Sequence, residues 1–224
     1  MPVIDAPDYQ ERVVFAGANG SGKTVLASEM IAGYSRVVIL DIKGDFPIPA
    51  SWRKDSYVIT VRPPMGLSNA HIWSRNRIIY RPTRVYRSAV GLTYFLVKMF
   101  DRAAREGKKR PFILYLDEGL YTLHKAKEII RDIAITGRSM GLGLWISVQR
   151  LKGGVVEIRS EAWRWYIFFM PGKSDDEEVE DYSKGQISQQ DMAALGVDYS
   201  FWELRRGKGG RIEARHYPPV AISS

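Results

Sequence analysis

The sequence predicts an α/β fold in which helices flank a mainly parallel central sheet. Short apolar runs alternate with helical segments along the chain. Several of these runs, such as Val37–Leu40 and Pro111–Leu116, have the continuous apolar character of strands that are buried on both faces. Near the end of the chain, the glycine-rich turn 207–210 separates Tyr199–Arg206 from Arg211–Tyr217, which predicts a C-terminal β-hairpin.

The other predicted elements follow in a regular order. Further strands are predicted at Arg12–Ala16, Tyr57–Val61, Arg77–Tyr80, Leu144–Val148 and Trp165–Met170. Helices are predicted at Thr24–Gly33, Tyr86–Glu106, Lys125–Thr136, Ser174–Ser183 and Ser188–Leu195, the last two with serine caps. No internal repeat or low-complexity linker interrupts this order, so we expect residues 1–224 to form a single domain.

Composition narrows the class of protein further. The absence of cysteine excludes disulfides and thiolate metal sites, and only three histidines are present. No apolar run approaches the roughly 20 residues of a membrane-spanning helix, and the N-terminus does not read as a secretory signal. We therefore expect no transmembrane segment and an intracellular setting. The net charge of +8 favours a polyanionic partner.

A glycine-rich loop between the first strand and the first helix is the strongest motif. Residues 17–24 read Gly-Ala-Asn-Gly-Ser-Gly-Lys-Thr and fit the P-loop pattern G-x-x-x-x-G-K-[ST] at every fixed position. In this pattern backbone N–H groups surround phosphate oxygens, Lys23 reaches the β- and γ-phosphates, and the Thr24 hydroxyl binds Mg²⁺. The predicted ATP-binding residues are Gly17, Ala18, Asn19, Gly20, Ser21, Gly22, Lys23, Thr24 and Val25.

Acidic and polar residues follow two later strands. Asp117 is predicted to hold Mg²⁺, and Glu118 to orient and activate the attacking water. Gln149 ends the strand Leu144–Val148, and parallel strand ends share an edge of the sheet with the P-loop. Gln149 is therefore predicted to contact the γ-phosphate or the attacking water, with a surface glutamine at the start of a loop as the alternative.

Arg138 follows the helix after the acidic pair. It is predicted to be an arginine finger that reaches the γ-phosphate of a neighbouring subunit. An ordinary surface arginine is the competing interpretation. Arg131 and Arg150 are the alternatives for the finger itself.

Taken together, the motifs resemble the FtsK–HerA superfamily of DNA-pumping ATPases. Besides the P-loop, the resemblance rests on the segment Asp41–Phe46 (Asp-Ile-Lys-Gly-Asp-Phe), on Asp117-Glu118, and on Gly137-Arg138 with the strand-terminal Gln149. We expect neither the barrel domain of HerA helicases nor the membrane and DNA-reading domains of FtsK translocases. In size it is similar to the genome-packaging ATPases of tailless double-stranded DNA viruses with internal membranes.

The resemblance implies a RecA/FtsK-like P-loop core that uses ATP and Mg²⁺. It also implies a ring of five or six copies that moves double-stranded DNA into a preformed capsid. Portal or vertex proteins of the capsid would be its partners, in the host cytoplasm or at the packaging vertex of the virion. The preference for ATP over other nucleotides depends on this resemblance.

Basic residues are unevenly distributed along the chain. No acidic residue occurs from Ser56 to Phe100. Because a translocase grips the phosphate backbone without reading sequence, this stretch is the predicted DNA surface, with Trp73 and Tyr80 placed to stack on bases. The alternative is ion pairing between subunits with the acidic run Asp175–Glu178. The predicted DNA-binding residues are Arg75, Arg77, Arg81, Arg84 and Arg87.

Two other functions stay open. A conjugative coupling or filamentous-phage assembly ATPase shares the motor but usually carries a membrane segment. A nucleotide-dependent switch or a small-molecule kinase belongs to a different class. The adjacent acids Asp117 and Glu118 argue against the kinase, and the separate basic stretch argues against the switch.

Overall fold

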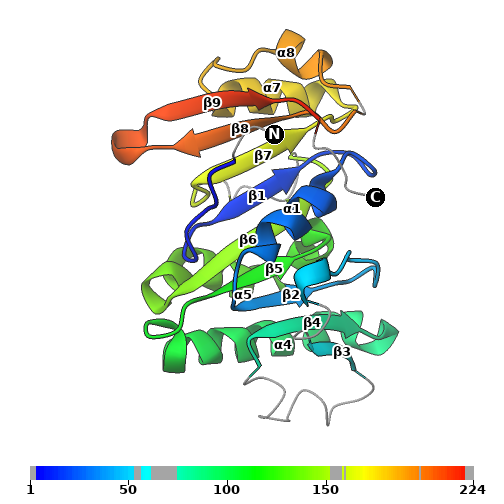
Figure 1. Ribbon diagram of the computed structural model, residues 1–224, viewed down its shortest axis with the longest axis vertical. Coiled ribbons are helices and arrows are strands. Elements are labelled where there is room, and N and C mark those ends of the chain that lie inside the picture. Colours follow the sequence, from blue (N-terminus) through cyan, green and yellow to red (C-terminus); the bar gives the residue numbers. More distant parts are fainter. Residues whose placement is uncertain are drawn as a thin grey trace.

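The computed structural model describes residues 4–52, 57–61, 75–151, 158, 160–196 and 198–219. In this part of the chain nine strands form one sheet in the order β3-β4-β2-β5-β6-β1-β7-β8-β9 (Figure 1). The pairs from β3 to β7 are parallel, and β8 and β9 are added antiparallel, so the predicted parallel sheet with a closing hairpin is confirmed. The strands are β1 Val13–Ala16, β2 Val37–Leu40, β3 Tyr57–Val61, β4 Arg77–Pro82, β5 Phe112–Leu116, β6 Leu142–Val148, β7 Arg164–Phe168, β8 Phe201–Arg206 and β9 Ile212–Tyr217.

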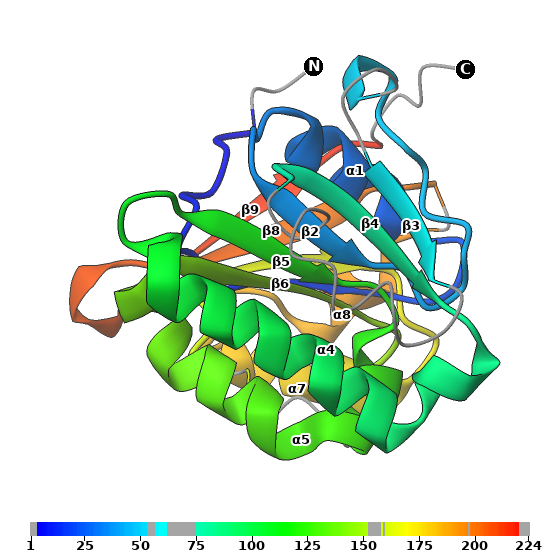
Figure 2. The same cartoon turned by 90° about the horizontal axis from the view of Figure 1, so that it is seen from below.

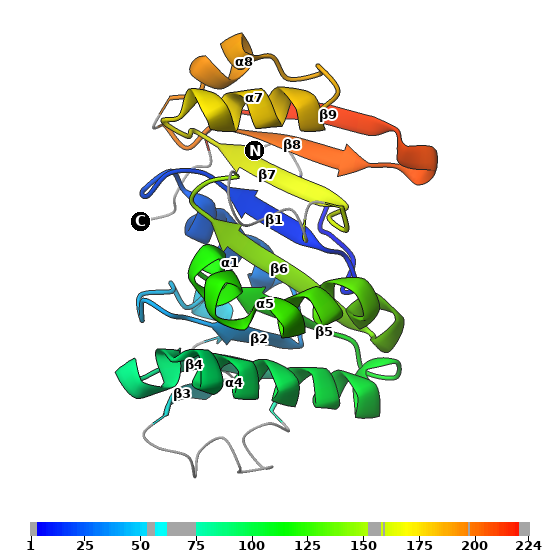
Figure 3. The same ribbon diagram turned by 180° about the vertical axis from the view of Figure 1, so that it is seen from behind.

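Helices cover both faces of the sheet. Helix α1 lies on one face, while α4, α5 and α7 lie on the other (Figures 2 and 3). None of the described helices is both long enough and apolar enough to cross a membrane. The helices are α1 Lys23–Ala32, α4 Ala89–Arg102, α5 Gly119–Thr136, α7 Lys173–Tyr182 and α8 Gln189–Ala193, with short 3₁₀ or π turns η1 Ala50–Trp52, η2 Arg84–Arg87, η3 Ala103–Gly107, η4 Gly137–Met140 and η5 Lys208–Gly210.

Two apolar layers hold these helices to the sheet. Successive residues of a strand point to opposite faces, so β1 supplies Val14 to one layer and Phe15 to the other. The layer under α1 includes Leu26 and Ile31, and the layer under α4 and α5 includes Phe95. All these side chains are at most 2% exposed. The central strands are therefore buried on both faces, as their continuous apolar runs predict.

Helix α5 begins at Gly119 rather than at the predicted Lys125. Glu118 has a left-handed backbone conformation (φ 53°), which turns the chain directly from β5 into the helix. Ala126 then departs from helical geometry (φ −141°), so the helical period changes within the segment. This interruption explains why the sequence pattern shows only the second part of the helix.

The cap of helix α7 also differs from the prediction. Its N-cap is Gly172 without a side-chain hydrogen bond, rather than Ser174. The Asp175 carboxylate in the first turn accepts a hydrogen bond from the Leu151 backbone N–H at 2.9 Å, which ties α7 to the end of β6. The predicted serine cap of α8 is confirmed, because Ser188 forms a capping box.

Helix α4 is shorter than the predicted Tyr86–Glu106. The Ser88 hydroxyl caps it by accepting a hydrogen bond from Gly91 N at 3.2 Å. The chain before Ser88 forms the separate turn η2, and the chain after Arg102 forms the π turn η3.

Candidate nucleotide site

Four segments meet at one edge of the sheet, which we call the carboxyl edge because the parallel strands end there. The P-loop follows β1, residues 41–46 follow β2, Asp117 and Glu118 follow β5, and Gln149 follows β6. The opposite edge, where these strands begin, is the amino edge. The structure thus brings the predicted phosphate loop and the predicted polar residues to the same end of the fold.

The phosphate loop is anchored between its two neighbouring strands. Gly17 N donates to Val148 O at 3.1 Å, and Ala18 N donates to Phe169 O at 2.8 Å. Gly20 and Gly22 have φ angles of 76° and 102°, which side-chain-bearing residues rarely adopt. The loop therefore keeps a curled conformation that leads into the N-terminus of α1.

Lys23 and Ser21 present polar atoms inside this loop. The Lys23 side chain is buried, and Nζ donates to the carbonyl oxygens of Gly17 at 2.6 Å and Ala18 at 2.7 Å. Burial lowers the pKa of Lys23 from 10.5 to about 8. The hydroxyl of Ser21 is buried without a hydrogen-bond partner among the described residues. A buried cation and an unused hydroxyl in a glycine-rich loop fit a phosphate group.

The residues beside the loop fit Mg²⁺. The Tyr115 hydroxyl donates to Asp117 Oδ1 at 3.4 Å and lies close to the Thr24 side chain, so both predicted metal ligands lie around one hydroxyl. Carboxylate oxygens of Asp117, Asp41 and Asp45 lie within 4.8 Å of one another. Burial, followed by the charges of Glu118 and Asp41, raises the pKa of Asp117 to about 6. Oxygen ligands with concentrated negative charge are those that Mg²⁺ prefers.

Asp41 holds the segment 41–46 in place and does not face the cavity as a free ligand. It is fully buried and accepts hydrogen bonds from Gly44 N at 2.7 Å and Phe46 N at 3.1 Å. It also forms an ion pair with Arg81 Nε at 2.8 Å. Because these contacts occupy its oxygens, Asp117 and Thr24 remain the residues best placed to hold the metal.

Glu118 is held by two polar neighbours. Gln149 Nε2 donates to Glu118 Oε2 at 2.8 Å, and Lys43 Nζ forms an ion pair with Glu118 Oε1. Gln149 therefore lies beside Glu118, and its predicted contact with the γ-phosphate or the attacking water stays a prediction. Lys43 is not among the predicted site residues, although it lies within the segment that carries the family resemblance. The left-handed backbone of Glu118 is a strained conformation of the kind that clusters at functional sites.

A cavity of about 220 Å³ joins these groups. It contains most of the predicted P-loop residues together with Glu118. Its lining adds two residues that the sequence did not identify, Lys43 and Tyr199. The lining residues are Asn19, Gly20, Gly22, Lys23, Thr24, Val25, Lys43, Glu118 and Tyr199.

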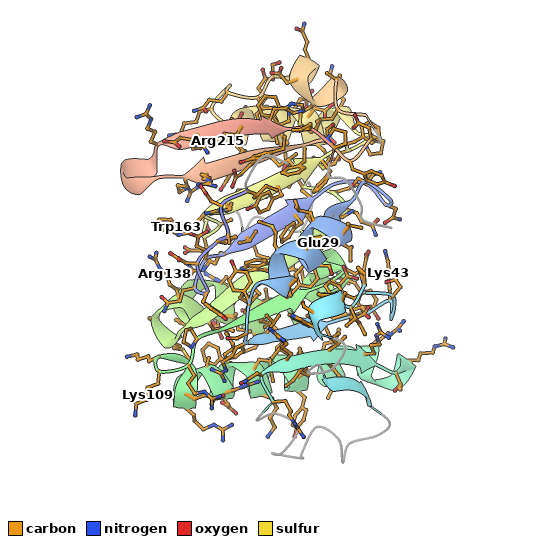
Figure 4. The ribbon with its side chains drawn as sticks, in the orientation of Figure 1. Glu29, Lys43, Lys109, Arg138, Trp163 and Arg215 are labelled. Atoms are coloured by element: carbon orange, nitrogen blue, oxygen red, sulfur yellow. The ribbon has the colours of Figure 1, made fainter. Side chains whose placement is uncertain are left out.

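Arg138 lies at the amino edge, away from the P-loop of its own chain. Figure 4 shows Arg138 and Trp163 at one end of the strands and Lys43 at the other. The Arg138 guanidinium lies over the Trp163 ring, 4.6 Å from its centre. Its role as a finger in a neighbouring subunit stays a prediction. Arg150, the alternative, is exposed next to Gln149 at the carboxyl edge.

The predicted DNA-binding arginines do not form one surface. Arg75 and Arg77 lie at the amino edge, and Arg84 and Arg87 at the carboxyl edge. Strand β4 separates them by roughly 17 Å at its usual rise per residue. Arg81 is engaged by the buried Asp41, so its guanidinium belongs to the fold. Residues 62–74, including Arg62 and Trp73, lie outside the described residues.

The expectation that Tyr80 stacks on bases is wrong. Its side chain is fully buried, and its ring stacks on Phe95 with centroids 4.7 Å apart. Tyr80 therefore contributes to the apolar layer under α4.

Comparisons with known proteins agree with this geometry. No protein-family model matches the sequence, and no curated protein matches it. Among solved structures, the genome-packaging NTPase B204 of Sulfolobus turreted icosahedral virus 2, in complex with AMPPCP, superimposes with a TM-score of 0.70 at 17% identity. The match covers 95% of this chain and 100% of that chain. The present chain therefore has a P-loop NTPase fold.

Two further solved structures have a fold similar to that of the present chain. The bacterial conjugative coupling protein TrwBΔN70 superimposes with a TM-score of 0.61 at 12% identity, covering 96% of this chain and 86% of that chain. The cytoplasmic domain of the type VII secretion ATPase EccC from Thermomonospora curvata gives a TM-score of 0.53 at 16% identity, with 94% of this chain matching 25% of that chain. The predicted resemblance to FtsK–HerA ATPases is thereby confirmed at the level of the fold.

Proposed function

We propose that this chain is an ATP-hydrolysing motor that translocates double-stranded DNA and packages a viral genome into a preformed capsid. The observation that carries the proposal is the joint placement of Lys23, Asp117, Glu118 and Gln149 at one edge of a fold that matches a genome-packaging NTPase over its whole length. ATP analogues bind to that packaging NTPase, which supports a nucleotide as the ligand of the present cavity.

Nucleotide binding would use polar groups of the phosphate loop that have no ion-pair partner within the described part of the chain. Lys23 would exchange the carbonyl oxygens of Gly17 and Ala18 for phosphate oxygens, which stabilise its charged form. The hydroxyl of Ser21 and the N–H groups of the loop would complete the cradle. Thr24 and Asp117 would hold Mg²⁺, which when bound neutralises developing charge on the phosphate oxygens.

Hydrolysis would depend on Glu118 and Gln149. Glu118 is a carboxylate in the lining of the cavity and would accept a proton from water. Gln149, hydrogen-bonded to Glu118, would orient the same water. Lys43 pairs with the other oxygen of Glu118, and we propose that this ion pair opens when Glu118 activates water.

DNA binding and ring assembly complete the proposal. The net charge of +8 provides a general attraction to the phosphate backbone, and Arg84 and Arg87, at the carboxyl edge, remain the proposed contacts. Five or six copies would form a ring in which Arg138 of one copy completes the site of the next. The capsid portal or vertex proteins would be the partners, at the packaging vertex or in the host cytoplasm.

A conjugative coupling motor is the second candidate. The match to TrwBΔN70 supports this candidate, because it covers 96% of the present chain and 86% of that chain. Both candidates predict DNA-stimulated hydrolysis. They differ in their partners, because only the packaging motor is expected to bind capsid vertex proteins.

The decisive experiment measures ATP hydrolysis by the assembled protein with and without double-stranded DNA at low salt. We expect DNA to stimulate the native protein, and Glu118→Gln to lose about 10²- to 10⁴-fold in rate. Glu29→Gln, on the exposed surface of α1, is the matched control and should behave as native (Figure 4). Hydrolysis by the native protein that is indifferent to DNA would reject the translocase and favour a nucleotide-dependent switch.

A further inference from the structure

Tyr199 has an unusual backbone conformation that its neighbours maintain. Its φ angle is 68°, in the left-handed region that residues with a Cβ rarely adopt. The Asp198 carboxylate accepts hydrogen bonds from Ser200 N at 3.1 Å and Ser200 Oγ at 2.7 Å, which fixes the turn around Tyr199. Such conformations persist where surrounding contacts hold them, and they cluster at ligand sites.

The turn places the Tyr199 ring against the phosphate loop. A Cβ on Gly22 would lie only 2.8 Å from Tyr199 Cδ1, so the ring contacts the loop where glycine leaves room for it. The ring is half-buried and lines the nucleotide cavity. An aromatic face next to the phosphate cradle is therefore open to a ligand.

The order of the strands determines on which side of the P-loop the Tyr199 ring lies. In the sheet, β2 and β5 lie on one side of β1, whereas β7 and β8 lie on the other. Lys43 and Glu118, which follow β2 and β5, are therefore on one side of the P-loop, and Tyr199, which precedes β8, is on the other. A nucleotide that points its terminal phosphate at Glu118 must direct its base away from that side.

We infer that the Tyr199 ring stacks on the base of the bound nucleotide. The inference rests on the proposed nucleotide site and assigns the part of the ligand that the P-loop does not bind. Every nucleobase has a π-face, so the ring contributes affinity for a nucleotide over a bare polyphosphate rather than a choice between bases.

The test compares binding of ATP with binding of inorganic tripolyphosphate by titration calorimetry. Tyr199→Gly removes the ring and accepts the positive φ, and Tyr199→Asn is a second variant that tolerates the same conformation. Tyr199→Phe retains the ring. Tyr94→Ala, which removes an exposed aromatic ring on α4, is the remote control.

We expect Tyr199→Gly and Tyr199→Asn to weaken ATP binding about tenfold and to leave tripolyphosphate binding unchanged. Tyr199→Phe and Tyr94→Ala should bind both ligands as the native protein does. Native ATP binding with no loss in the ring-deleting variants, or an equal loss for both ligands, would overturn the role of Tyr199 alone. Failure of the native protein to bind ATP would instead overturn the proposed nucleotide site, together with this inference.

Discussion

Two buried polar clusters in this protein differ in how far the fold satisfies them. In the cluster between β7, β8 and β9, Glu203 is fully buried and receives three donors. Arg164 Nη1 lies 3.3 Å and Arg205 Nε 2.8 Å from Oε1, and the Tyr217 hydroxyl lies 3.0 Å from Oε2. We call these four residues the Glu203 cluster. Its charges are paired within the protein, as buried charges must be if they are not to destabilise the fold.

The nucleotide site is arranged in the opposite way. Lys23 bonds to carbonyl oxygens of its own loop, and Ser21 Oγ has no partner among the described residues. Glu118 combines a strained backbone with an ion pair to the half-exposed Lys43. The difference indicates that one cluster stabilises the fold and that the other is completed by a ligand. The predictions below test this contrast, beginning with the largest expected effect.

Removing the central acid of the Glu203 cluster should strongly destabilise the fold. Glu203→Ala removes the carboxylate that Arg164 and Arg205 share. Because Glu11 still pairs with Arg164 and Asp5 with Arg205, we expect a loss of about 3 kcal/mol, the lower end of the cost of breaking a buried pair. The free energy of unfolding from denaturant titration measures the effect. Glu213→Ala, an exposed glutamate on the adjacent strand β9, should change stability by less than about 0.5 kcal/mol. Equal losses of unfolding free energy in the two variants would show that Glu203 does not stabilise the fold more than an exposed glutamate does.

In the nucleotide site, the position of Glu118 depends on close packing between Gly119 and β6. A Cβ on Gly119 would lie 2.1 Å from Ile146 Cγ1 and 2.9 Å from Ser147 O, so Gly119→Ala forces α5 away from β6. We expect about 1–3 kcal/mol of destabilisation and a loss of hydrolysis, because Glu118 moves with the helix. Gly33→Ala is the matched control, since the nearest atom there is 3.6 Å away. Native stability for Gly119→Ala would contradict the packing argument.

The buried charge of Lys23 should lower the stability of the fold. Burial lowers the pKa of Lys23 from 10.5 to about 8, so between these pH values the unfolded chain binds more protons than the folded chain. The native protein should therefore gain stability as pH rises from about 8 to 10.5.

Lys23→Met removes this buried charge. It should abolish that pH-dependent gain, raise stability at pH 7 by about 1 kcal/mol, and eliminate ATP hydrolysis. Denaturant unfolding at pH 7 and pH 10, with the exposed Lys125→Met as control, measures the difference. A variant less stable than native at pH 7 would place Lys23 among the stabilising residues instead.

The sequence predicted the parts of the site that follow from strand order. The P-loop, Asp117, Glu118 and Gln149 each follow a buried strand, and parallel strands bring such residues to one edge. For the same reason the apolar runs predicted the sheet. These inferences need only the positions of strands along the chain.

Other features depend on register and on turns, which the residue pattern does not specify. The five arginines look continuous in sequence, but β4 carries them from one edge of the sheet to the other. Arg81 meets Asp41 because Leu40 pairs with Tyr80 in parallel register. Tyr199 reaches the cavity only because its left-handed turn faces Gly22 across the sheet order β1-β7-β8. No local pattern reveals such contacts.

The smallest expected effect concerns the link between Lys43 and Glu118. The Lys43 side chain is 43% exposed, so its ion pair contributes little free energy, on the scale of 0.2–1 kcal/mol for exposed pairs. Lys43→Met should therefore leave folding unchanged and raise DNA-independent hydrolysis about two- to fivefold, because Glu118 no longer needs to break the pair before it activates water. Steady-state hydrolysis without DNA, alongside Lys125→Met, measures this. A lower rate in Lys43→Met would mean that Lys43 assists the reaction itself rather than holding Glu118 in an ion pair.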